Sequence, residues 1–77
     1  MKVKDILHRL KANSRTFKYL DDKDRIYFKN SYNYLKNNKE RELSKFSQTL
    51  LDDYLVKNDI DYLVKIKAIQ FVSTNLI

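Results

Sequence analysis

The 77-residue chain contains no glycine, no proline, no cysteine and no tryptophan, and it has a single histidine. The lack of glycine excludes the loops that hold phosphate groups by close backbone approach, and with them P-loop and dinucleotide-binding sites. It also excludes an EF-hand loop and the strained turn of a nucleophile elbow. Tight hairpins favour glycine, and proline kinks or ends helices. Together these absences favour helices joined by short polar turns.

The lack of cysteine limits how so short a chain can be stabilised. Disulfides are impossible, and a structural zinc site is disfavoured because His8 is the only histidine or cysteine ligand. A domain of this size buries only about 60–65% of its extended-chain surface, so it needs good helix packing or a partner chain. We therefore expect one helical domain spanning 1–77, with no cofactor and no metal.

Long hydrophobic runs are absent too. The longest uncharged stretch is 68–77, which is far shorter than the roughly 20 residues that span a bilayer. Residues 1–12 carry too many charges for the core of a signal peptide. We expect a cytoplasmic location, in the host cytoplasm if the source is viral, and no membrane span. A helix lying on a membrane surface is a weaker interpretation, because the first apolar stripe is narrow and lacks Trp and Phe.

Apolar residues recur at helical spacing and predict an all-α fold, a compact bundle of about four short helices. We expect these helices at about 2–12, 22–37, 39–57 and 60–76, with an additional short turn at 15–20. The third helix has the clearest pattern. Its expected core-facing residues are Leu43, Phe46, Leu50, Leu51 and Tyr54.

The polar breaks between these segments predict the helix ends. Asn13 and Ser14 offer a stop and a restart, and the Asp21, Asp22 and Asp24 carboxylates suit a helix N-terminus. Asn37 and Asn38 separate the second and third helices and place Glu40 in a first turn. Asp59 is the expected N-cap of the last helix.

The segment 60–76 is apolar around most of a helical circumference, which is typical of a central helix or of a subunit interface. A strand is the rival interpretation, because Val64, Ile66 and Ala68 alternate with two lysines. Helix is favoured, since the chain offers no second strand with hairpin chemistry.

One pentapeptide occurs twice. Residues 53–57 and residues 61–65 both read Asp-Tyr-Leu-Val-Lys. Two copies do not make a solenoid, which needs longer and more numerous units. Because a break separates them, we expect the two copies to face different directions.

Positive charge is concentrated near the N-terminus and predicts a binding surface for phosphate or for an acidic protein. Residues 1–20 hold six cations against Asp5 alone, in a chain of net charge +6. Polar residues of the second helix form another candidate face for a DNA-reading helix. The predicted binding residues are Lys2, Lys4, Arg9, Lys11, Arg15, Lys18, Lys29, Asn30, Asn33 and Lys36.

Catalysis has little support in the sequence. The Asp21, Asp22 and Asp24 cluster lacks the glycine turn and the distal Glu of a cation-binding loop, so we interpret it as helix capping. His8 lacks a neighbouring nucleophile and is expected on the surface. We therefore predict a protein that is not an enzyme.

Two binding functions remain open. The first is a small non-catalytic regulator that contacts DNA or RNA through the basic N-terminal face. The second is an adaptor or inhibitor that docks on an acidic surface of a larger protein, for example one that processes nucleic acid. The composition resembles that of small regulators from phages and mobile elements of AT-rich hosts, without any shared motif. An apolar C-terminal end also suggests a homodimer, through Phe71, Val72, Leu76 and Ile77.

Overall fold

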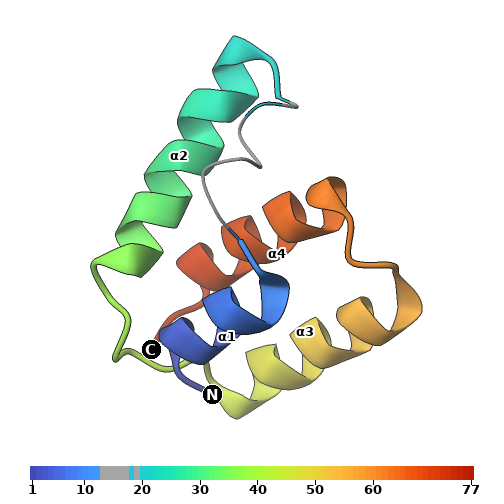
Figure 1. Ribbon diagram of the computed structural model, residues 1–77. Coiled ribbons are helices and arrows are strands. Elements are labelled where there is room, and N and C mark those ends of the chain that lie inside the picture. Colours follow the sequence, from blue (N-terminus) through green and yellow to red (C-terminus); the bar gives the residue numbers. More distant parts are fainter. Residues whose placement is uncertain (13–17, 19) are drawn as a thin grey trace.

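The helical interpretation of the chain is confirmed by its computed structural model, which describes residues 1–12, 18 and 20–77 (Figure 1). Within these residues the chain forms four helices and no strand. They are α1 (Val3–Leu10), α2 (Asp22–Lys36), α3 (Lys45–Lys57) and α4 (Tyr62–Thr74). The expected turn at 15–20 lies largely outside the described residues. Among the described residues, no helix is both long enough and apolar enough to cross a bilayer.

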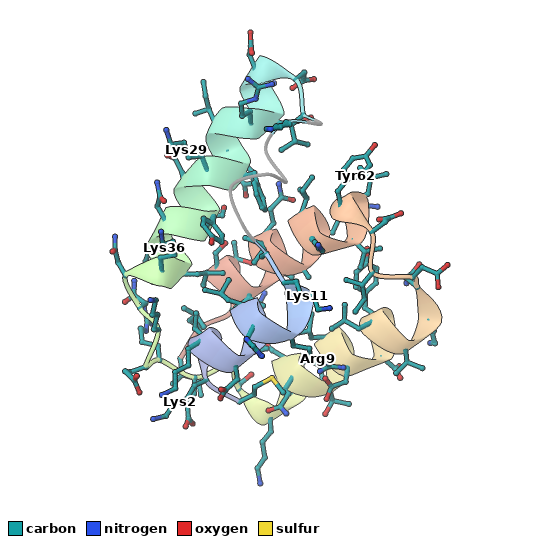
Figure 2. The ribbon with its side chains drawn as sticks, viewed as in Figure 1. Lys2, Arg9, Lys11, Lys29, Lys36 and Tyr62 are labelled. Atoms are coloured by element: carbon teal, nitrogen blue, oxygen red, sulfur yellow. The ribbon has the colours of Figure 1, made fainter. Side chains whose placement is uncertain are left out.

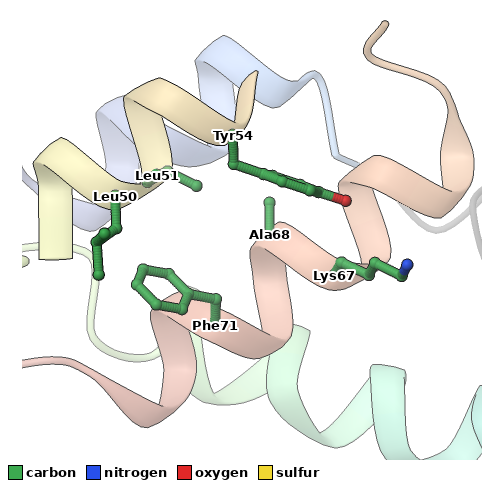
Figure 3. A pocket seen from close by; sticks show the side chains of 6 residues that line it. All are labelled: Leu50, Leu51, Tyr54, Lys67, Ala68 and Phe71. Carbon is green, nitrogen blue, oxygen red and sulfur yellow. The ribbon is translucent and has the colours of Figure 1, made fainter. Parts of the chain in front are cut away.

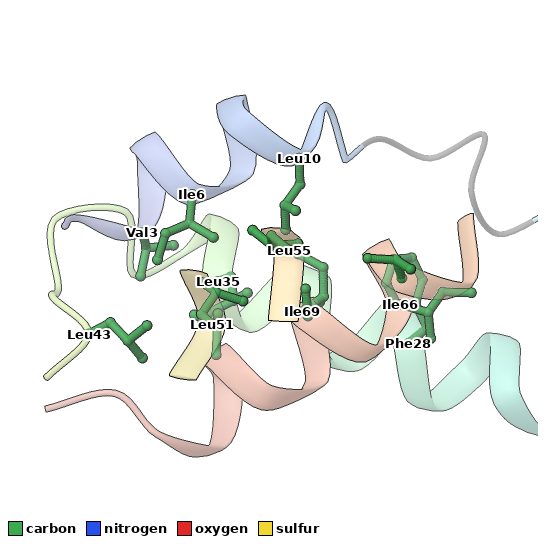
Figure 4. Close-up of a cluster of buried hydrophobic side chains, with 13 residues drawn as sticks. Val3, Ile6, Leu10, Phe28, Leu35, Leu43, Leu51, Leu55, Ile66 and Ile69 are labelled. Carbon is green, nitrogen blue, oxygen red and sulfur yellow. The ribbon is translucent and has the colours of Figure 1, made fainter. Parts of the chain in front are cut away.

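The last helix occupies the centre of the bundle, as its apolar circumference predicts. α4 packs against both α2 and α3, and α1 packs against α2 (Figure 1). The strand interpretation of this segment is wrong, because Tyr62–Thr74 is continuous helix. The buried side chains of α4 are Val64, Ile66, Ala68, Ile69 and Val72. They meet side chains from the other three helices, among them Ile6, Phe28 and Leu51 (Figure 4).

The third helix differs from its expected form at its beginning. It starts at Lys45 rather than near residue 39, because the Ser44 side chain accepts a hydrogen bond from the Ser47 amide and caps the helix there. Leu43 is buried but precedes the helix, whereas Phe46 is 75% exposed and Leu50 is exposed. Leu51 is buried as expected and Tyr54 is half-buried, and Ser47 and Leu55 complete the buried face of α3.

The other caps agree only partly with the expected ones. Asp21 caps α2 by accepting from the Asp24 amide, as the acidic cluster predicts. The N-cap of α4 is Asp61 and not Asp59, since the Asp61 carboxylate accepts from the Val64 amide. Helix α1 ends at Leu10, before Asn13, with Lys11 in the left-handed region at φ 52°. The lack of glycine thus leaves a lysine in a conformation that costs about 1–2 kcal/mol.

The connection between α2 and α3 holds both ends of the chain. The Val3 amide donates to the Arg41 carbonyl, and the Lys4 amide donates to the Lys39 carbonyl. These bonds satisfy amides at the start of α1, whose N-cap Lys2 makes no side-chain cap. On the other side, the Ile77 amide donates to the Glu42 carbonyl. We call residues 39–43, with these bonds to both chain ends, the terminal clasp.

Candidate functional site

The structure divides the predicted basic residues into paired and unpaired groups. Lys2 and Lys4 both pair with Glu40, at 2.9 and 3.3 Å between nitrogen and oxygen. The Arg9 guanidinium binds Asp52 on α3, and this ion pair ties α1 to α3. Three of the predicted cations therefore have a carboxylate partner inside the fold, which lowers the positive potential that they present to a ligand.

The ion pairs of Glu40 shift the pKa of two side chains beside α1, those of Glu40 and Lys2. Hydrogen bonds from Lys2 and Lys4 lower the pKa of the Glu40 carboxyl below its ordinary value of 4.5. The same contact, with the charge of Glu40, raises the pKa of Lys2. Glu40 therefore stays ionised at neutral pH and offsets part of the positive charge of the two lysines.

Other cations converge on a cleft between α1 and α2, which we call the basic cleft. It has a volume of about 560 Å³, and its two sides come from distant parts of the sequence. Figure 2 shows Lys11 at the end of α1 and Lys36 near the end of α2. The residues that line it are Lys4, Leu7, His8, Lys11, Ala12, Tyr32, Lys36 and Lys39.

Three exposed lysines give the cleft its positive charge. Among the residues that the structure describes, Lys11, Lys36 and Lys39 have no carboxylate within ion-pair distance, in contrast to Lys4. All three are exposed. They come from the C-cap of α1, from α2 and from the connection that follows α2, so only the folded chain brings them together. Unpaired ammonium groups at one concave surface favour a polyanionic ligand.

Tyr32 forms the apolar wall of the basic cleft. Its hydroxyl donates to the Ala12 carbonyl at 3.2 Å, which links α2 to the end of α1. Its ring stacks on buried Phe28 at 6.2 Å between centroids, and the Lys36 ammonium lies 5.6 Å from the ring centroid. These contacts fix the ring and hold the Lys36 side chain beside it by a cation–π interaction.

The remaining predicted binding residues lie elsewhere. Lys29, Asn30 and Asn33 are exposed on α2 but do not line the cleft, and Lys18 is exposed beyond α1. Arg15 lies outside the described residues. Conversely, the sequence pattern singled out neither Lys39 nor Tyr32 as a binding residue, and it gave His8 only a surface role. The backbone bond from Lys4 to Lys39 is what brings Lys39 to the cleft.

The predicted self-association residues are also separated. Val72 is fully buried in the core of the chain, so its side chain is not at the surface, and self-association through the C-terminal end stays a prediction. Leu76 is half-buried and Ile77 is exposed. Phe71 is half-buried and lines a second, apolar hollow between α3 and α4. Its side chain therefore faces a surface that the sequence pattern did not indicate.

Within the described residues, no three His, Cys, Asp or Glu side chains come together as metal ligands. Comparison of the chain with protein-family models, curated proteins and solved structures gave no match. The basic cleft is the site whose side chains converge most clearly on one class of ligand.

Proposed function

We propose that the protein is a small non-catalytic regulatory protein that binds nucleic acid through the basic cleft. The observation that carries the proposal is the convergence of Lys11, Lys36 and Lys39, three unpaired cations from separate segments, on one concave surface. Neutralising phosphates with such groups releases counterions, which is the main source of sequence-independent affinity. A cytoplasmic location goes with this proposal, because the cysteine-free chain suits a reducing compartment.

The side chains in the cleft favour contact with the backbone of the nucleic acid. Lysine ammonium groups bind phosphate as point charges, and no arginine lines the cleft among the residues that the structure describes. Phosphate contacts of this kind set the position of a protein but carry no sequence information. Asn30 and Asn33, exposed on α2, are the nearest candidates along that helix for contacts with base edges. We therefore expect the affinity to depend strongly on salt concentration and only weakly on the sequence of the nucleic acid.

The test is fluorescence anisotropy with labelled duplex DNA, single-stranded DNA and RNA at low and near-physiological salt. The triple variant Lys11→Gln, Lys36→Gln, Lys39→Gln removes the cleft cations. We expect it to bind the preferred probe roughly tenfold more weakly or worse, with a reduced slope of affinity against salt. The matched control is Lys23→Gln, Lys45→Gln, Lys57→Gln, which removes the same number of charges outside the cleft.

The control decides between a site and a general charge effect. We expect it to change affinity less than about threefold, since distant exposed charges are screened by salt. Equal losses in both triple variants would show that net charge, and not the cleft, attracts the probe. Lack of binding to all three probes at low salt would reject nucleic acid as the ligand and leave an acidic protein surface for the cleft.

A further inference from the structure

A second concave surface lies between α3 and α4 and has the opposite chemistry to the basic cleft. It is a hollow of about 260 Å³ lined by Leu50, Leu51, Tyr54, Lys67, Ala68 and Phe71. In Figure 3 the Tyr54 ring and Leu50 from α3 face Ala68 and Phe71 from α4. We call this surface the apolar groove. It shares no residue with the basic cleft.

The groove continues an exposed apolar stripe along α3. Phe46, Leu50 and Tyr54 follow each other at intervals of four residues, so they lie on one face of the helix. Phe46 and Leu50 are exposed, although burial of such a side chain in a core is worth about 1.5–3 kcal/mol. On the other wall, Leu63 is exposed one turn before Lys67, which is itself one turn before Phe71. Two helical walls with apolar floors make the shape that accepts a third helix.

The charge at the rim indicates what covers this surface. Lys67 is exposed and has no carboxylate partner among the described residues. Lys57, in line with Leu50 on α3, is paired with Asp53 at 3.6 Å. A second copy packed on this surface would add a second Lys67 without a carboxylate partner to the interface, in chains that each carry a net charge of +6. Like charges at an interface oppose such a dimer.

We propose that the apolar groove binds an acidic amphipathic helix of a partner protein. The large apolar side chains of the partner helix, at i, i+4 and i+7 spacing, fill the space between Leu50, Ala68 and Phe71. An Asp or Glu on its polar edge pairs with Lys67. Phe46 extends the contact beyond the end of the hollow and supplies an aromatic anchor of the kind that dominates interface energetics.

Two synthetic amphipathic peptides test this proposal against the isotope-labelled full chain by NMR. They share the same leucines at helical spacing and differ only in carrying Glu or Lys on the polar face. We expect the acidic peptide to shift the amide resonances of Leu50, Tyr54, Ala68 and Phe71, and to bind about tenfold more tightly than the basic one. Lys67→Glu should reverse that preference, whereas Lys23→Glu, which changes the same charge on α2, should leave it in place.

Matched variants separate the groove from the basic cleft. Leu50→Glu should abolish peptide binding, whereas Val56→Glu, on the same helix outside the groove, should not. The triple cleft variant should still bind the acidic peptide, so this proposal can fail or succeed independently of nucleic-acid binding. Three results would overturn it: no binding of either peptide, equal binding of both, or resonance shifts confined to the basic cleft. Sedimentation that shows a dimer abolished by Leu50→Glu would assign the groove to a second copy instead.

Discussion

The two copies of the pentapeptide Asp-Tyr-Leu-Val-Lys lie in very different surroundings. In the first copy, within α3, Leu55 is 6% exposed and Val56 is 82% exposed. In the second, at the start of α4, the order is reversed: Leu63 is 52% exposed and Val64 is 8% exposed. The expectation that the copies face different directions is confirmed. Both are helical except for the capping Asp61, so the difference lies in which side of the helix meets the core.

The residues outside the pentapeptide cause this difference. Leu55 continues the line of Ser47 and Leu51, whereas Val64 begins the line of Ala68 and Val72. Each line repeats every four residues and follows one face of its helix. Moving the buried position from the third to the fourth residue rotates the copy by about 100°. The comparison shows that a short sequence can determine helix formation while its longer context determines burial.

The leucines offer the largest test of this comparison. Leu55→Ala removes a buried side chain and should lower the free energy of unfolding by about 2–5 kcal/mol. Leu63→Ala, the same change in the exposed copy, should cost less than about 1 kcal/mol. Urea unfolding followed by circular dichroism measures both values. Equal losses would mean that the burial difference between the two copies is absent in solution.

The valines test the same comparison in reverse, because Val64 of the second copy is buried and Val56 of the first copy is exposed. Val64→Ala should cost about 1–2 kcal/mol, because it removes two buried methyl groups. Val56→Ala should stabilise the protein by a few tenths of a kcal/mol, since alanine has the higher helix propensity at an exposed position. In the same urea experiment, the change in the free energy of unfolding should therefore have opposite signs in the two variants. A loss of stability in Val56→Ala would contradict the exposed position of that side chain.

The aspartates give a smaller difference at the polar end of each copy. Asp61→Ala removes the N-cap of α4 and should cost about 1 kcal/mol. Asp53→Ala removes only an exposed pair with Lys57 and should cost about 0.2–0.5 kcal/mol. Thermal unfolding at low and high salt separates them, because salt screens the exposed pair more strongly than the hydrogen bond of the cap. Asp61→Asn, which retains a capping oxygen, should recover most of the larger loss.

Local patterns in the sequence predicted most of the fold. The periodicity of the first, second and last segments predicted helices close to Val3–Leu10, Asp22–Lys36 and Tyr62–Thr74. The apolar circumference of α4 left a central helix or a subunit interface open, and within the chain the helix is central. The beginning of α3 could not be predicted in the same way. Leu43 sits at helical spacing from Leu50 and Leu51, yet it belongs to the terminal clasp, whose bonds reach both ends of the chain. Such pairing across long sequence separations leaves no periodic signal.

The sequence predicted only some residues of the candidate site, because it does not show which side chains the fold brings together. Lysines in the first helix and Lys36 in the second were expected to bind a ligand, and their types and exposure could be read directly from the sequence. Their grouping could not, because it depends on which carboxylates approach them in the fold. Glu40 pairs with Lys2 and Lys4, and Asp52 pairs with Arg9. The terminal clasp brings Lys39 to the cleft beside the cations that have no carboxylate partner.

The position of the terminal clasp predicts how the molecule should respond to a force applied to its two ends. Met1 and Ile77 lie near each other because the Leu43 amide donates to the Met1 carbonyl and the Ile77 amide to the Glu42 carbonyl (Figure 1). A force that pulls the two ends apart therefore acts first on a few hydrogen bonds of residues 39–43, before it reaches any helix. Once those bonds open, the start of α1 loses the partners of its first amides. The bundle should then yield from α1 inward, with the core around α4 the last part to separate.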